Sequence, residues 1–179
     1  MRDISYKVAL GGIVSALCLV TMFLAGILPA FYLILPMIAG VLLMLIAAEV
    51  NTAWAMLTYL SVSILSMFIT FDKEAALVFI LIFGHYPIIR PYIQKIPVRL
   101  IQGIIKLVIF NLCALAYFYL TVYIFGIKEM LEEFEVAGKY GGWLMLGFSD
   151  VIFVLYDINL SLLYKIYRER LLPRFRRRK

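Results

Sequence analysis

The sequence predicts an all-α integral membrane protein with about six transmembrane helices and with both termini in the cytoplasm. Hydrophobic residues make up 65% of the 179 residues and charged residues only 16%, against about 45–50% and about 25% in soluble domains. A soluble domain of this length buries only about 70% of the surface of its unfolded chain. A mean hydropathy of +1.00 would therefore leave large apolar areas in water. The composition excludes a soluble enzyme, a disordered chain and a nucleic-acid-binding module.

Long apolar runs identify the individual spans, because about 20 helical residues cross a bilayer core about 30 Å thick. A transmembrane β-barrel would instead alternate apolar with polar residues. Polar residues, glycine and proline separate the runs from one another. The predicted spans are residues 8–27, 30–48, 53–71, 75–89, 100–125 and 143–163. They form one domain, residues 1–164, which is followed by a basic cytoplasmic tail, residues 165–179.

The first three spans are separated by short turns. The first span ends at Pro29, the second ends at Glu49, and the third ends at the charged triplet 72–74. The first span has a charged start, as a signal peptide does. Its apolar run is too long for a cleaved signal peptide, however, and no clear cleavage site follows it. Because the first two spans are joined so closely, a hairpin that enters the membrane only part-way is an alternative for them.

The fourth span is predicted to lose its regularity around His85 and Pro87. Proline removes a backbone donor and crowds the preceding turn, so the span is expected to continue as a kinked or re-entrant piece to about residue 89. Broken helices expose backbone groups that bind solutes in transporters. The alternative is that His85, the only histidine of the chain, is a hydrogen-bonding residue at a helix terminus.

The largest loop, residues 126–142, connects the last two spans. Ile127, Met130, Leu131 and Phe134 follow the i, i+3, i+4, i+7 spacing of a short amphipathic helix that lies on the membrane surface. Gly138, Gly141 and Gly142 follow this segment and predict a flexible return of the chain to the membrane. Such flexibility would allow the loop to act as a lid. The alternative is a solvated connector.

The distribution of lysine and arginine predicts the orientation, since basic residues are enriched on the cytoplasmic side. With a cytoplasmic N-terminus, 14 of the 17 basic residues lie inside. Residues 174–179 form a dense cationic end, and such an end gains about 1 kcal/mol per charge from anionic lipid. The sequence therefore predicts a multi-pass protein of the cell membrane whose tail binds anionic lipids.

Three ionisable residues, Lys106, Asp150 and Asp157, lie within the predicted spans, where an unpaired charge costs several kcal/mol. Lys106 and Asp157 each lie about 9 Å from the inner end of their span, at a rise of about 1.5 Å per residue. Adjacent antiparallel helices would bring the two together. We therefore expect them to form a structural ion pair.

Asp150 and Asn111 lie deeper, at about 17–20 Å from the inner face by the same rise per residue. Asp150 and Asp157 are two helical turns apart and face the same side, and Ser149, Tyr156 and Asn159 add to this polar seam. Asp150 has no obvious cation at its depth, so it is the better candidate for a ligand contact or a protonatable site. The alternative is a carboxylate that reaches water through an outer vestibule.

The sequence predicts no enzyme, no cofactor, no metal site and no catalytic residue. With a single histidine, the chain lacks the paired histidines of a zinc protease, and it has no glycine-rich phosphate loop. Ser149 and His85 are expected at opposite depths, so they cannot cooperate in catalysis. Cys18 and Cys113 lie in apolar runs, where cysteines pack as small hydrophobic residues.

Small residues recur at helical spacing on the first span. Ala9, Gly12 and Ala16 would lie on one face, and such a face lets another transmembrane helix approach closely. The segment 9–17, Ala-Leu-Gly-Gly-Ile-Val-Ser-Ala-Leu, resembles the Ala-xxx-Ala region near the start of the first helix in the S components of energy-coupling factor transporters. S components are the substrate-binding membrane subunits of these importers, and they also have six spans with both ends inside.

This resemblance implies a subunit that captures a vitamin or similar micronutrient from outside. It implies partners as well, namely a transmembrane coupling subunit on which the first helices dock and a pair of ATPases that supply the energy. In that family the ligand lies near the outer face among the later helices. The residues at corresponding places here are Asp150, Asn111, Trp143, Tyr140 and Tyr123. The alternative is a structural or regulatory scaffold of the cell envelope without a small-molecule substrate.

Overall fold

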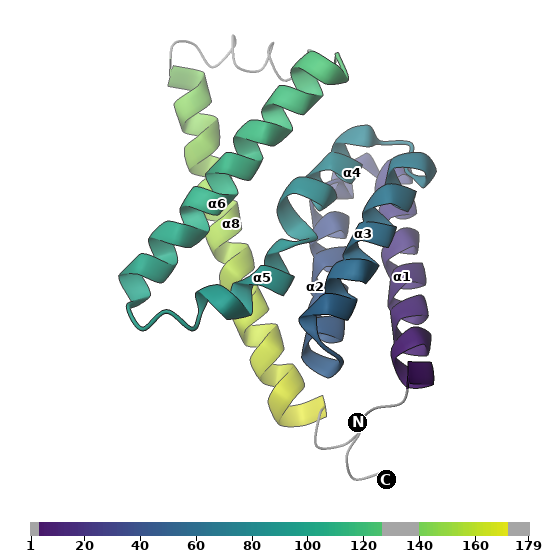
Figure 1. The fold of residues 1–179 in the computed structure, drawn as a ribbon. Helices are drawn as coiled ribbons and strands as arrows, with labels where there is room; N and C mark the ends of the chain where they lie inside the picture. The colour runs from purple at the N-terminus through teal and green to yellow at the C-terminus, as the bar shows by residue number, and fades with distance from the viewer. Residues whose placement is uncertain (1–3, 127–139, 172–179) are drawn as a thin grey trace. The chain divides into compact units, whose positions relative to one another are not determined.

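The computed structural model describes residues 4–126 and 140–171, and within these residues the chain forms helices and turns but no strand. The predicted all-α class is therefore confirmed. The chain divides into two compact units, Met1–Glu132 and Glu133–Lys179, and the elements of each are coloured by residue number in Figure 1. The predicted surface helix at 127–134 and the basic end at 174–179 lie outside the described residues.

The first unit contains most of the helices. In chain order they are α1 (Ile4–Ile27), the 3-10 turn η1 (Pro29–Phe31), α2 (Ile34–Glu49), α3 (Thr52–Ile69), α4 (Lys73–Val78), the π-helix η2 (Phe79–Phe83), α5 (Tyr86–Ile93), α6 (Arg99–Tyr119) and the π-helix η3 (Leu120–Ile124). The described part of the second unit contains α8 (Gly141–Ile166) and the π-helix η5 (Tyr167–Leu171). The first residues of the predicted tail are thus helical.

Five helical stretches among the described residues are long and apolar enough to cross a membrane. They are Ile4–Ile27, Thr52–Ile69, Lys73–Ile93, Arg99–Ile124 and Gly141–Glu169. The remaining apolar helix, α2, has 16 residues and so extends only about 24 Å, less than the bilayer core of about 30 Å. It begins at Ile34 rather than near residue 30, because Pro29 starts a separate 3-10 turn before it.

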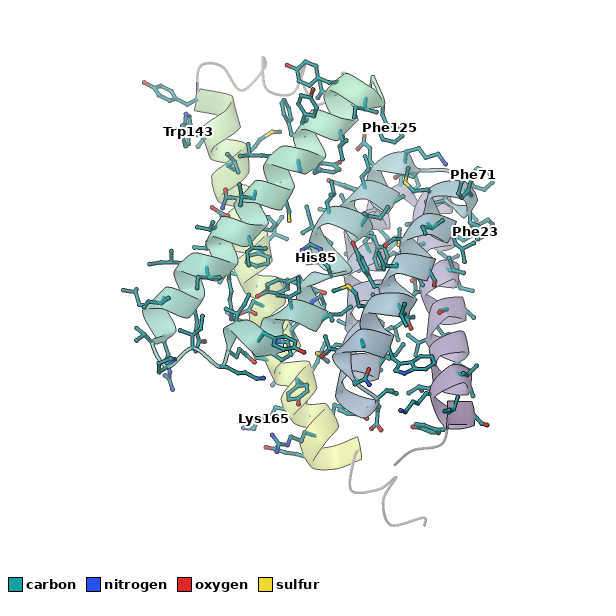
Figure 2. The ribbon with its side chains drawn as sticks, in the orientation of Figure 1. Phe23, Phe71, His85, Phe125, Trp143 and Lys165 are labelled. Atoms are coloured by element: carbon teal, nitrogen blue, oxygen red, sulfur yellow. The ribbon has the colours of Figure 1, made fainter. Side chains whose placement is uncertain are left out.

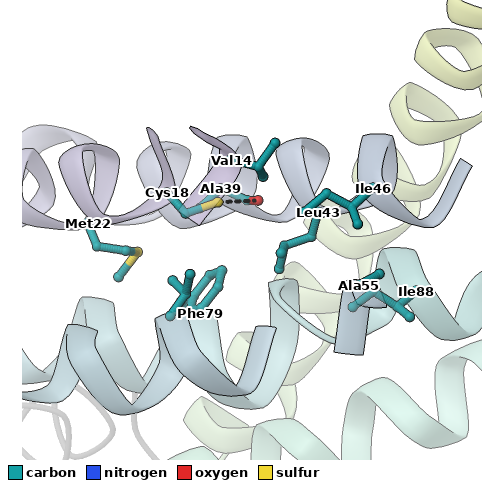
Figure 3. Close-up of a cluster of buried hydrophobic side chains, with 10 residues drawn as sticks. Val14, Cys18, Met22, Ala39, Leu43, Ile46, Ala55, Phe79 and Ile88 are labelled. Carbon is teal, nitrogen blue, oxygen red and sulfur yellow. Dashed lines mark hydrogen bonds between the residues drawn. The ribbon is translucent and has the colours of Figure 1, made fainter. Parts of the chain in front are cut away.

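The core of the first unit lies between α1, α2 and α3, which pack side by side (Figure 1). The residues buried on α1 recur every three or four positions and face α2 and α3. The cluster of buried side chains in Figure 3 comprises Val14, Cys18, Met22, Ala39, Leu43, Ile46, Ala55, Val62, Phe79 and Ile88. Within it, the Cys18 thiol donates to the Ala39 carbonyl at 3.5 Å. Apolar packing thus holds α1 to its neighbours along one face only.

The residues that follow α3 pack against the last turns of α1. The Thr70 hydroxyl donates to the Met22 carbonyl at 3.3 Å, and the rings of Phe23 and Phe71 lie 5.9 Å apart (Figure 2). A Cβ on Gly26 would lie 2.9 Å from the Phe71 backbone nitrogen. Only glycine therefore allows the turn after α3 to approach α1 this closely.

The fourth apolar stretch runs from Lys73 to Ile93 and is broken in the middle, as the sequence predicts, but it continues past residue 89. Pro87 lies in the first turn of α5, where the missing N–H has no helical partner to lose. The helix also accommodates Pro91. As a result Arg90, which lies just beyond the predicted end of the fourth span at residue 89, is a buried residue of α5.

Candidate functional site

The predicted partner face on α1 lies on the outside of the first unit. Ala9, Gly12 and Ala16 are all exposed, and a Cβ built on Gly12 would meet nothing within 4 Å. The other small residues of this helix behave differently, because Gly11 is buried and Ser15 is half-buried. The structure therefore brings the three predicted residues together on one accessible helix face.

The residues of the predicted ion pair and of the predicted ligand contact lie on two helices, α6 and α8, which belong to different units. Lys106 and Asn111 lie on α6 in the first unit, and Asp150 and Asp157 lie on α8 in the second. Asn111 donates through its amide to the Leu107 carbonyl at 2.9 Å, one turn back on its own helix. The pairing of Lys106 with Asp157 and the juxtaposition of Asn111 with Asp150 stay predictions.

Two neutral polar side chains of the predicted seam on α8, those of Ser149 and Asn159, bond to the backbone of their own helix. Ser149 donates to the Met145 carbonyl at 2.8 Å, and Asn159 donates to the Leu155 carbonyl at 2.9 Å. A hydroxyl or amide that bonds four residues back satisfies itself without a second helix. These residues therefore need no partner helix to lie within a membrane span, and they add no evidence for a ligand next to Asp150.

The aromatic residues predicted near the ligand lie at helix ends and are well exposed. The ring of Tyr123 packs against that of Tyr119 in a tilted arrangement, with ring centroids 5.0 Å apart. Tyr140 and Trp143, at the start of α8, are 67% and 78% exposed, and Trp143 is labelled in Figure 2. Exposed tyrosine and tryptophan at the ends of transmembrane helices are typical of the interfacial aromatic belt.

The break in the fourth apolar stretch is a π-helix. The Gly84 N–H donates to the Phe79 carbonyl at 2.7 Å, five residues back rather than four. This leaves the Ile80 carbonyl accessible to side chains, and the Tyr59 hydroxyl of α3 donates to it at 2.6 Å. Single π-helical turns occur frequently at functional sites. The break therefore marks a candidate site in the middle of the span.

Gly84 allows Tyr59 to reach this carbonyl. A Cβ on Gly84 would lie 2.7 Å from the Tyr59 ring and 2.8 Å from the Phe79 carbonyl oxygen. Both distances are shorter than side chains tolerate. The backbone of Gly84 is in the ordinary helical region, so contact with Tyr59, rather than backbone conformation, requires glycine here.

His85, which is labelled in Figure 2, contacts Cys113 of α6. Its Nε2 lies 3.8 Å from the Cys113 Sγ, and its ring meets the Tyr59 ring edge-on, with centroids 6.2 Å apart. Three spans thus contribute to the cluster of Tyr59, His85 and Cys113, which we call the π-helix site.

Sequence reasoning identified the break and His85 but missed Tyr59 and Cys113. The available signal was the Gly84-His85-Tyr86-Pro87 motif, which marks one helix but does not indicate its neighbours. The apolar run around Cys113 predicts that it packs as a small hydrophobic residue. This interpretation holds for Cys18, which is fully buried in the core, whereas Cys113 is half-buried next to a histidine.

No family model, curated protein or solved structure matches the chain. The fold by itself defines the class: the protein is an all-α protein with helices that are long and apolar enough to span a membrane. What the protein does within this class is inferred from its surfaces and polar clusters.

Proposed function

We propose that the protein is a non-enzymatic, solute-binding membrane subunit of the S-component type. Its substrate is a vitamin or similar micronutrient, and partner ATPases supply the energy for import through a transmembrane coupling subunit. The proposal places the protein in the cell membrane with both termini in the cytoplasm. A scaffold without a small-molecule substrate is the alternative.

The small-residue face of α1 carries this proposal. Ala9, Gly12 and Ala16 lie within the segment that resembles the docking region of S components, and they are exposed along a helix whose opposite face is buried in the core. Small residues allow close backbone approach, which drives helix association in lipid. A face of this kind supports a docking role for α1.

A purification of tagged chain from membranes of the native cells, in mild detergent, tests the partner. We expect the wild-type chain to co-purify an ATP-hydrolysing complex, and Gly12→Leu to lose it, because leucine would hold the partner helix away. Gly12 has free space around it, so this variant should fold normally. Gly103→Leu, at a glycine of α6 that likewise has nothing within 4 Å, is the matched control and should keep the complex.

Native mass spectrometry of the same preparations tests the solute. We expect a bound small molecule in the wild-type chain, with lower occupancy in Asp150→Asn and little change in thermal stability. An empty chain together with a tightly bound protein that does not hydrolyse ATP would favour the scaffold. Equal occupancy in Asp150→Asn would remove Asp150 from the binding site.

A further inference from the structure

The connection between α5 and α6 carries cationic and apolar side chains next to each other in the first unit (Figure 1). Lys95 and Arg99 lie within five consecutive residues, and both are exposed. Tyr92 and Leu100, on either side of them in the sequence, are 51% and 74% exposed. We propose that this connection binds the phosphate headgroup of an anionic phospholipid through Lys95 and Arg99, while the neighbouring apolar side chains contact its acyl chains.

Charge complementarity selects an anionic occupant. The sequence contains no aspartate or glutamate between Glu74 and Glu129, whereas five lysines and arginines lie in this interval. Glu49 is the carboxylate at the same end of the unit, since the Tyr92 hydroxyl donates at 2.9 Å to the hydroxyl of Thr52, three residues after Glu49. One carboxylate does not balance the cations of α5 and of the connection, so this end of the unit attracts anions.

Contacts within the first unit hold the connection in place. The Lys95 Nζ lies over the Tyr92 ring, 4.8 Å from its centroid, and the hydroxyl of this tyrosine is itself bonded to α3. The Gln102 amide donates to the Ile96 carbonyl at 2.6 Å and to the Gln94 carbonyl at 3.4 Å. Groups that are already ordered lose less conformational entropy on binding. The connection and its lysine are thus positioned before a lipid binds.

The position of the cations favours a lipid over a phosphate compound in solution. The apolar stretch Arg99–Ile124 begins at Arg99, so this residue lies at the level of the lipid headgroups when the stretch crosses a membrane. Val98 and Ile101 are exposed beside it, and acyl chains would cover them, whereas a soluble phosphate compound would not. Basic sites at the cytoplasmic ends of transmembrane helices bind anionic headgroups. The inference shares only the membrane location and orientation with the proposed function, and it requires neither a solute nor a partner subunit.

Native mass spectrometry of the purified full-length chain, titrated with phosphatidylglycerol in a neutral detergent, tests the site. We expect the double variant Lys95→Gln, Arg99→Gln to bind this lipid at least about tenfold more weakly than the wild type, because both cations are lost. The double variant Lys7→Gln, Lys165→Gln is the matched control, since it removes two charges from the same predicted side of the membrane, and it should bind as the wild type does. Both variants keep the basic end of the chain, so its contribution cancels in the comparison.

Thermal unfolding of the same proteins provides a second measurement and shows that the variants are folded. Phosphatidylglycerol should raise the unfolding temperature of the wild type and of the control, but not that of Lys95→Gln, Arg99→Gln, and phosphatidylcholine with the same acyl chains should raise none of them. Inorganic phosphate should not displace the bound lipid. The proposal is overturned if the control loses as much affinity as Lys95→Gln, Arg99→Gln, if neither variant loses affinity, if phosphatidylcholine binds equally well, or if inorganic phosphate displaces the lipid.

Discussion

At the scale of single residues, the contacts around a few positions allow only one residue type. Gly84 is the clearest of these, because it lies in helical backbone, where alanine would normally be preferred by about 0.5–1 kcal/mol. The Tyr59 ring and the Phe79 carbonyl occupy the space that a Cβ would need. For Gly84→Ala, packing therefore predicts a loss of stability, whereas helix propensity predicts a gain.

We expect Gly84→Ala to lower the free energy of unfolding by about 1–3 kcal/mol, the usual cost of overpacking, because contact outweighs propensity. Gly12→Ala, at a helical glycine with free space, should leave stability unchanged or slightly raised. Thermal unfolding of both variants in the same detergent compares the two. A Gly84→Ala variant as stable as the wild type would show that Tyr59 does not pack against this glycine.

At the scale of elements, side-chain caps determine where two of the helices begin. Asn51 accepts from the Trp54 N–H at 2.9 Å at the start of α3. Asp72 accepts from the Glu74 N–H at 2.9 Å and from the Ala75 N–H at 3.1 Å at the start of α4. The charged triplet that the sequence identified as the end of the third span is thus also the start of the fourth.

The cap at Asp72 gives a prediction for this element. Asp72→Ala should destabilise the protein by about 1 kcal/mol, the usual cost of losing an N-cap. Asp72→Asn should have little effect, because asparagine caps helices about as well as aspartate does. Thermal unfolding at one pH and salt concentration checks both variants. A loss of stability in Asp72→Asn equal to that in Asp72→Ala would attribute the effect to charge rather than to capping.

The elements also show why the fourth span differs from its sequence-based description. The pattern around Gly84 and Pro87 correctly predicts a break. It does not predict that the backbone shifts to π-helical bonding at Phe79, because this shift depends on the Tyr59 hydroxyl that takes up the exposed carbonyl. Nor does it predict that Arg90 is buried, because the helix continues through Pro91 instead of ending near Pro87.

At the scale of the whole molecule, the polar residues of α6 and α8 are predicted to pair by their depth within the spans. The depth arithmetic predicts that Lys106 pairs with Asp157. Lys106→Ala should therefore destabilise the protein, and adding Asp157→Ala should restore part of the loss, with a coupling of about 0.5–3 kcal/mol. A double-mutant cycle by thermal unfolding measures this coupling, and strictly additive losses would show that the two residues do not interact.

The candidate functional residues were predictable to different degrees. The face formed by Ala9, Gly12 and Ala16 follows from helical spacing, because the period of a helix is known in advance. The pair formed by His85 and Cys113 does not, because the two residues are far apart in the sequence and come together only where α6 passes the π-helix. No local pattern around Cys113 distinguishes it from an apolar packing residue.

The sequence alone determined that this is an all-α protein with helices that are long and apolar enough to span a membrane. It can do so because the bilayer requires every backbone polar group to be bonded within its own helix, so an apolar run of sufficient length is enough. Only the tertiary structure decided which small-residue face of α1 is exposed and which side chains meet at the π-helix. Residues that face lipid and residues that face protein are equally apolar, so neither periodicity nor composition distinguishes them.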